Sequence, residues 1–290
     1  MNLRTLFLPV LFLTAVVIYL TGCSSKTVEF PSINYSGNKE YNSGQVVWRD
    51  LISPDPAKSI EFYKKVFGWT AVKSGTEEDP YWLFKLDGKP VAGMYQMKES
   101  GKKAGGEWVQ YYSLSKQEDF VSKAKPLGAA QILKPVNIPG RGKVSLYTDP
   151  AGAYFALINS LNGDPNASEP KDFEFLWSEL WSNDPDKSTV FYKDSFNFQT
   201  ESKKDDNRDY IILKNNEKLV SGIIKNPAEN VRDHWVQYVR VNDVREMEEK
   251  AKLAGAKILI PADVKIRKGT VSVFLDPTGA PIAVQKWPIE

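Results

Sequence analysis

Few side chains in this sequence could carry acid–base or nucleophilic chemistry. The 290 residues include a single histidine, His234, and a single cysteine, Cys23. A general base needs a nucleophile or an orienting partner within hydrogen-bond reach, and the carboxylates considered for that role are Asp50, Glu107 and Glu179. His234 begins a predicted strand, where a polar residue at a strand edge is the simpler interpretation. His234, Glu107, Asp50 and Glu179 are therefore the candidate catalytic residues, and no reaction is assigned to them.

These candidates stand at matching places of an internal repeat. The stretch WRDLISPDPAKSIEFYKKVFGW, from Trp48, matches WSELWSNDPDKSTVFYKDSFNF, from Trp177, at a shift of 129 residues. At a shift of 127, EWVQYYSL from Glu107 matches HWVQYVRV from His234, and LYTDPAGAYFAL matches VFLDPTGAPIAV. Such an ordered series indicates a tandem duplication with a boundary in the loop of residues 162–172. Because Glu107 stands where the second copy has His234, a mechanism shared by both copies is not supported.

Both copies predict the same order of elements. VVWRDLIS is a strand, and Asp55-Pro56 begins a helix, because the carboxylate caps free N–H groups and proline suits the first helical turn. Apolar residues at helical spacing then predict one face buried against a sheet. YWLFKL and KPVAGMYQM are predicted to form a hairpin. WVQYYSL is predicted to be a strand and residues 118–127 a helix, and the last two strands, VSLYTD and AYFALINS, flank a DPAG turn. The chain therefore contains four predicted βαβββ modules, two in each half.

This order resembles the vicinal oxygen chelate superfamily, which includes glyoxalase I, bleomycin-resistance proteins and extradiol dioxygenases. The resemblance rests on βαβββ twice per half, an FY-x-x-x-F-G helix end and a DPxG turn before the last strand, over about residues 45–160 and 173–287. It implies an α+β fold with two tandem glyoxalase-like domains, residues 45–161 and 173–290.

The resemblance also implies where a metal would be held. Metal-using members place four protein ligands in the cleft between two modules. The corresponding positions here are Trp48, Gly93, Val109 and Ala156 in the first copy and Trp177, Gly222, Val236 and Ala283 in the second. None of these side chains offers the oxygen or imidazole donor that a divalent ion needs. We therefore expect no metal and no other cofactor at the usual place.

Aromatic residues are expected to line both clefts instead. Side chains two apart on a strand point the same way, which gives a set of candidate ligand-binding residues. They are Trp48, Tyr111 and Tyr154 in the first copy and Trp177, Trp181 and Tyr238 in the second. An apolar concave surface with a few polar groups suits a small hydrophobic or aromatic ligand, although the same residues could fill the clefts as core. The basic loops PGRGKV and KIRKGTV could contact an anion over the clefts or simply be solvated.

The N-terminus has a different composition. Arg4 precedes the uncharged run LFLPVLFLTAVVIYL, which is typical of a signal peptide, and LTGC (residues 20–23) resembles the bacterial lipobox. The lipobox implies removal of residues 1–22, palmitate-type lipidation of Cys23 and a bacterial cell-envelope location. In a double-membraned bacterium the outer membrane is favoured, because Ser24 is not aspartate. An uncleaved anchor helix is the alternative. Residues 23–44 are rich in Ser, Asn, Gly and Lys and are expected to form a flexible tether.

Composition limits the class of partner. With a net charge of +2 the chain has no global basic field that would favour nucleic acid, and 42% hydrophobic residues suffice for two cores. The sequence favours a membrane-anchored, metal-free module that binds a small molecule or acts as a scaffold. One alternative is a lyase, isomerase or dioxygenase with a relocated site. Another is a module with filled clefts whose outer faces contact a partner.

Overall fold

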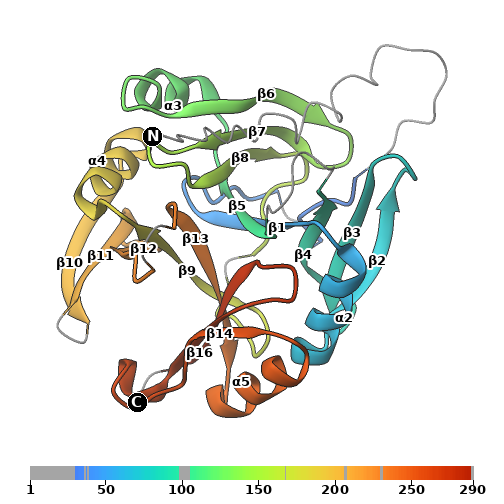
Figure 1. The fold of residues 1–290 in the computed structure, drawn as a ribbon. Coiled ribbons are helices and arrows are strands. Elements are labelled where there is room, and N and C mark those ends of the chain that lie inside the picture. Colours follow the sequence, from blue (N-terminus) through green and yellow to red (C-terminus); the bar gives the residue numbers. More distant parts are fainter. Residues whose placement is uncertain are drawn as a thin grey trace, which may run out of the picture.

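The computed structural model describes most of the chain beyond the N-terminus (Figure 1). The described residues are 30–35, 37, 39–97, 105–166, 168–205, 208–228 and 231–288. The predicted signal peptide, Cys23 and the first part of the predicted tether lie outside them. In the described part of the chain, no helix is long and apolar enough to cross a membrane.

The first half folds into two βαβββ modules that share one sheet. The first module comprises β1 (Val46–Ser53), α2 (Pro56–Phe67), β2 (Thr70–Gly75), β3 (Pro80–Leu86) and β4 (Lys89–Gln96). The second comprises β5 (Glu107–Ser113), α3 (Gln117–Ala124), β6 (Ala130–Ile138), β7 (Gly142–Thr148) and β8 (Tyr154–Ser160). The strand order is β2-β3-β4-β1-β5-β8-β7-β6, so the modules join where β1 and β5 pair antiparallel.

The second half repeats this arrangement. Its first module comprises β9 (Phe175–Ser182), α4 (Pro185–Phe196), β10 (Gln199–Asp205), β11 (Arg208–Asn215) and β12 (Lys218–Lys225). Its second module comprises β13 (His234–Val241), α5 (Val244–Leu253), β14 (Lys257–Ile260), the short 3₁₀ helix η2 (Arg267–Gly269), β15 (Val271–Leu275) and β16 (Pro281–Lys286). The strand order is β10-β11-β12-β9-β13-β16-β15-β14. The predicted α+β fold with two tandem domains is confirmed.

The helix that opens each half is capped as the sequence predicts. In α2 the carboxylate of Asp55 accepts a hydrogen bond from the backbone N–H of Lys58 at 3.1 Å, and Pro56 occupies the first turn. Gly68 ends the helix in the left-handed conformation with φ 71°, which glycine adopts without the steric penalty of a Cβ. Asp184 caps α4 in the same way. These caps fix where each helix begins and therefore which side chains face the sheet.

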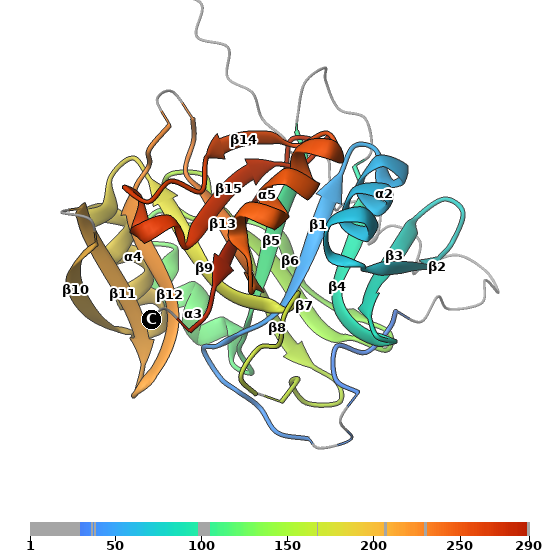
Figure 2. The ribbon, with the colours of Figure 1, turned by 90° about the horizontal axis from the view of Figure 1, so that it is seen from below.

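The helices pack across the halves rather than within one half. α2 contacts α5 and α3 contacts α4, and Figures 1 and 2 show both pairs from two directions. One core joins Phe62 and Tyr63 of α2 to Met247 of α5, and a second joins Phe120 of α3 to Tyr192 of α4. The strands of each domain pair within that domain, but the two helical cores are shared. The domains therefore bury apolar surface together, and this surface stabilises their association.

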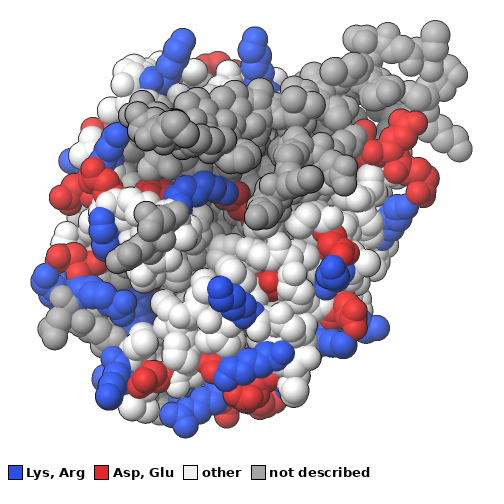
Figure 3. Space-filling view, in the orientation of Figure 1, with Lys and Arg blue, Asp and Glu red and all other residues white. Residues whose placement is uncertain are grey.

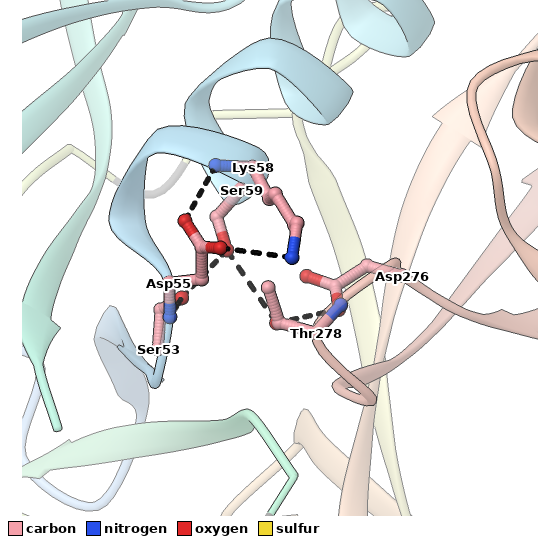
Figure 4. Close-up of polar contacts among 6 residues, drawn as sticks. All are labelled: Ser53, Asp55, Lys58, Ser59, Asp276 and Thr278. Atoms are coloured by element: carbon pink, nitrogen blue, oxygen red, sulfur yellow. Dashed lines mark hydrogen bonds and ion pairs between the residues drawn. The ribbon is translucent and has the colours of Figure 1, made fainter. Parts of the chain in front are cut away.

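The DPxG turn of the second half contacts the beginning of α2 (Figure 4). The Ser59 hydroxyl lies 2.8 Å from the Ser53 hydroxyl and 3.5 Å from the Thr278 hydroxyl. Asp276 accepts from the N–H and the hydroxyl of Thr278 at 2.7 Å and from the Tyr63 hydroxyl at 3.1 Å. The DPxG turn of the first half bonds to a tyrosine of α4 in the same manner. Each last hairpin is thus tied to the first helix of the other half.

The described part of the predicted tether is held against the first domain. Phe30, Ile33 and Asn34 are buried. The N–H of Phe30 donates to the carbonyl of Pro139 at 2.8 Å, and the Asn34 amide donates to the carbonyl of Asn162 at 2.8 Å. The polar composition predicts a flexible tether, but Phe30 and Ile33 in this segment pack on the core of the first domain.

Candidate ligand-binding clefts

A buried ion pair lies near the centre of the first sheet. Asp50 of β1 and Arg141, in the loop before β7, have side chains with no exposed surface, and Arg141 Nη1 lies 3.2 Å from Asp50 Oδ2. Trp48 Nε1 and the Tyr81 hydroxyl each donate to Asp50 Oδ1 at 2.8 Å. Arg141 Nη2 also donates to the Tyr81 oxygen at 2.6 Å, and Tyr111 bonds to Asp50 as well. The carboxylate is therefore paired and hydrogen-bonded, as a buried charge requires.

The second sheet carries a cluster of the same composition. Arg267, from η2 before β15, places Nη2 2.8 Å from Oε1 of the buried Glu179. The Tyr210 hydroxyl donates to Oε1 at 2.9 Å, and the Tyr238 hydroxyl donates to the other carboxylate oxygen. Trp177 Nε1 donates to the Tyr210 oxygen at 2.7 Å. Each domain thus combines a tryptophan, a carboxylate, two tyrosines and an arginine.

Burial keeps the donors of these clusters in their protonated forms. It raises the pKa of Tyr81 and of Tyr210 well above the usual tyrosine value, and the adjacent carboxylate adds to the effect. Both hydroxyls therefore remain hydrogen-bond donors at neutral pH. Burial by itself lowers the pKa of Arg141, but Tyr81 and Asp50 raise it above its usual value, so the guanidinium stays charged.

The clusters fill the space that a metal-ligand set would need. A Cβ at Gly93 would lie 1.6 Å from the Tyr81 oxygen and 2.1 Å from Asp50 Oδ1, and a Cβ at Gly222 would lie 2.2 Å from the Tyr210 oxygen. A ligand side chain at either position would clash, and the neighbouring guanidinium would repel a cation. Among the described residues, no group of three or more His, Cys, Asp or Glu could hold a metal ion. The residues present do not fit the metal that the resemblance implies.

The first cleft is closed by the chain itself. The Phe30 ring centroid lies 5.4 Å from that of Tyr81 and 6.1 Å from that of Tyr95. The Arg141 guanidinium carbon lies 5.8 Å from the Phe30 centroid, and Arg141 Nε and Nη2 each lie 3.4 Å from the carbonyl oxygen of Pro31. Phe30 and Pro31 therefore complete a packed core over the first cluster.

The second cleft adjoins a pocket of about 580 Å³. Its walls mix apolar side chains with charges of both signs, and two of its residues, Tyr210 and Arg267, belong to the second cluster. The lining residues are Pro185, Asp186, Ser202, Arg208, Asp209, Tyr210, Ile211, Ile224, Lys225 and Arg267. The side chain of Arg267 is 12% exposed, whereas that of Arg141 is 0% exposed. This volume is within the range of small-molecule sites.

The predicted cleft residues occupy different surroundings. Trp48, Tyr111, Trp177 and Tyr238 belong to the two clusters, where they hold the carboxylates directly or through a tyrosine. Trp181 is 1% exposed, and its indole Nε1 has no hydrogen-bond partner in the described structure. Its ring centroid lies 5.5 Å from that of His234. Tyr154 packs at the edge of the apolar core that contains Trp48, Tyr81 and Tyr111, and the Arg232 guanidinium carbon lies 5.3 Å from its ring centroid.

His234 and Glu107 are connected through Arg232. The Arg232 guanidinium bonds to Glu107 Oε2, and its carbonyl oxygen lies 2.9 Å from His234 Nδ1. A carbonyl can only accept, so Nδ1 carries the proton and Nε2 is the acceptor. Burial lowers the pKa of His234 below 6.5, and the ring is therefore neutral at neutral pH. Of the other candidates, Asp50 and Glu179 are held in ion pairs.

The importance of Arg141, Arg267, Tyr81 and Tyr210 was missed from the sequence. A signal was present, because both arginines lie in the basic loops PGRGKV and KIRKGTV. The composition of these loops allows an anion contact or solvation, whereas in the structure each arginine pairs with a carboxylate of the first strand of its own domain.

Charges on the outer surface are mixed. On the face drawn in Figure 3, Lys and Arg side chains are interspersed with Asp and Glu. This arrangement agrees with the net charge of +2. The visible face therefore presents no single-sign field of the kind that attracts nucleic acid.

Comparison with known proteins gives consistent matches in sequence and in fold. A family model described as Glyoxalase/Bleomycin resistance protein/Dioxygenase superfamily matches residues 44–157 and 175–284. The chain is 27% identical over 257 residues to "Putative glyoxylase CFP32" of Mycobacterium tuberculosis, covering 85% of this chain and 96% of that protein. It is 27% identical over 261 residues to the anthracycline biosynthesis protein DauV of Streptomyces sp., covering 83% and 92%. The Mn(II)-bound glyoxalase from Novosphingobium aromaticivorans shares the fold, with a TM-score of 0.56, 16% identity and coverage of 84% and 82%.

Proposed function

The chain belongs to the Glyoxalase/Bleomycin resistance protein/Dioxygenase superfamily, and from that premise we propose that its second domain binds a small aromatic molecule without a metal. The observation that supports this proposal is the difference between two clusters of equal composition. The first is closed over by Phe30, whereas the second adjoins a pocket lined by Tyr210 and Arg267. The first domain then acts as a structural partner that shares both helical cores.

The pocket offers groups that suit a flat, largely apolar ligand. Tyr210, Ile211 and Ile224 supply an aromatic ring and aliphatic surface, and an aromatic ligand can also interact with the Arg267 guanidinium through its ring face. Glu179 balances the charge of Arg267 at 2.8 Å. The site therefore does not need a charged ligand to neutralise Arg267.

Thermal unfolding in the presence of candidate ligands tests this proposal. With EDTA present, a binding aromatic compound at a hundred times its Kd should stabilise the protein by about 2.7 kcal/mol. Ile224→Trp, which fills the pocket, should abolish the shift. Leu219→Trp on the same strand, at a position 54% exposed, should preserve it. Stabilisation that requires a metal, or that survives Ile224→Trp, would contradict the proposal.

A second candidate function is a metal-independent lyase or isomerase reaction, for which His234 is the supporting observation. Its Nδ1 is fixed by a backbone carbonyl, and burial lowers its pKa, so the neutral Nε2 could accept a proton. If this domain catalyses a reaction, His234→Ala should remove turnover while leaving ligand binding intact. Unchanged turnover in that variant would eliminate this candidate.

We also propose that Cys23 anchors the protein in a bacterial envelope membrane, which is the outer membrane in a double-membraned bacterium. The support is the LTGC sequence after an uncharged apolar run. Mass spectrometry of the mature N-terminal peptide should find an acylated Cys23, and Cys23→Ser should leave the membrane fraction. An unmodified cysteine in membrane-bound wild-type protein would refute the anchor.

A further inference from the structure

The first cleft shows what kind of group its cluster can accept. The Phe30 ring lies against Tyr81, Tyr95 and Arg141, with the distances given above. The carbonyl oxygen of Pro31 lies 3.4 Å from two nitrogens of the same guanidinium. An aromatic ring and a carbonyl oxygen are thus held together by one arginine.

The pocket of the second domain lies at the corresponding place. Tyr81 pairs with Tyr95 across β3 and β4, and Tyr210 pairs with Ile224 across β11 and β12. Both of these pairs are related by the repeat shift of 129 residues. Arg267 lies one position before Lys268, the repeat equivalent of Arg141, but the two arginines have the same role because each pairs with the carboxylate of its own domain. The three residues that contact Phe30 therefore correspond to Tyr210, Ile224 and Arg267, and all three line the pocket.

We propose that this pocket binds an uncharged compound that carries an aromatic ring next to a carbonyl oxygen, and that Phe30 and Pro31 are an internal copy of it. This inference rests on the proposed function. The ring lies against Tyr210 and Ile224, and the carbonyl oxygen accepts a hydrogen bond from the Arg267 guanidinium, as the Pro31 carbonyl does from Arg141. Since Ile224 is smaller than the tyrosine at the equivalent position, the second pocket accommodates a larger ring than phenyl.

Charge distinguishes a ketone, ester or amide from the corresponding acid. Arg267 is already paired with Glu179 at 2.8 Å. A carboxylate ligand would approach Glu179 and be repelled by it at short range, whereas a neutral carbonyl adds no negative charge beside Glu179. The neutral form of a ligand should therefore bind more tightly than its free acid.

Calorimetric titration of the full-length protein in detergent tests this inference, with N-acetyl-phenylalanyl-proline amide as the probe. Wild-type protein should bind one equivalent, and N-acetyl-alanyl-proline amide should not bind. Arg267→Met and Ile224→Trp should each weaken binding at least about tenfold, while Leu219→Trp should not. Phe30→Ala exposes the first cleft and should raise the stoichiometry to two. Circular dichroism and melting temperature verify that each variant is folded.

Several results would overturn the inference. These are no binding by the wild type, affinity unchanged by both Arg267→Met and Ile224→Trp, or a stoichiometry that stays at one in folded Phe30→Ala protein. Failure of the proposed function is distinguishable. If other aromatic compounds bind and Ile224→Trp blocks them, the pocket is functional and only the ligand class is wrong. If no compound binds, both proposals fail.

Discussion

Replacement of each cluster arginine by methionine measures the difference between the closed and the open cleft. Arg141→Met and Arg267→Met remove the same charge and retain a long apolar side chain. In the first domain, Asp50 would keep its hydrogen bonds from Trp48, Tyr81 and Tyr111, but it would lose its ion-pair partner at a site where its side chain is 0% exposed. In the second, Glu179 would keep the hydroxyls of Tyr210 and Tyr238, and the pocket would admit water beside it.

The two costs should therefore differ. Removal of one partner from a fully buried ion pair costs about 3–5 kcal/mol, which we expect for Arg141→Met. Loss of the ionic partner of a carboxylate that gains water from an adjoining pocket should cost less, about 1–3 kcal/mol, which we expect for Arg267→Met. At about 2–4 °C per kcal/mol for domains of 150–250 residues, Arg141→Met should lower the melting temperature by roughly 6–20 °C.

Thermal and urea unfolding, followed by tryptophan fluorescence, provide the assay. Asp50→Asn combined with Arg141→Met removes both charges and should recover part of the loss, because no unpaired charge is left in the core. Equal destabilisation by the two arginine variants would refute the distinction between the clefts. A double variant that is less stable than Arg141→Met alone would show that charge pairing is not the cause.

Three further predictions concern other contacts. Burial lowers the pKa of His234 in the folded protein below 6.5, the ordinary value that it has in the unfolded chain. Its contribution to stability is therefore present above the unfolded-state pKa and is lost as the pH falls through the folded-state pKa. NMR of this single histidine should find the low pKa, and stability should fall less from pH 7 to 5 in His234→Gln than in wild type. Gly93→Ala should destabilise by about 1–3 kcal/mol through overpacking, because its Cβ would meet Tyr81 at 1.6 Å; an unchanged urea midpoint would contradict this. Tyr63→Phe removes a buried donor to Asp276 and should cost about 1–3 kcal/mol, whereas an unchanged melting temperature would show that this contact between the halves contributes nothing.

Local patterns were sufficient to predict the elements. The Asp-Pro caps and aromatic spacing placed α2, and the alternating strands and turn residues placed both hairpins of the first half. The helix predicted over residues 118–127 is shorter in the structure, where α3 ends at Ala124 and turns lead to Gly128. Helix ends are weakly specified by periodicity, since a turn can continue the same apolar face.

The residues that complete the clefts could not be predicted in the same way. Arg141 lies 91 positions from Asp50, and the ring of Phe30 lies on Tyr81 although 51 residues separate them by number. No periodicity relates such positions, because their contact depends on how two modules and an N-terminal segment meet in space. The sequence indicated that the usual metal-ligand positions lack donor side chains, but it did not indicate that a carboxylate–arginine pair occupies each cleft instead.

The repeat, the order of the modules and the chemistry of the ligand positions follow from residue types and short-range spacing, which act through caps, turns and alternation along one strand. The pairing of helices across the two halves, the two carboxylate–arginine pairs and the closure of one cleft depend on the tertiary structure. The physical reason is that a buried charge is stable only beside a partner that lies close in space, and the fold alone determines which distant side chain that is.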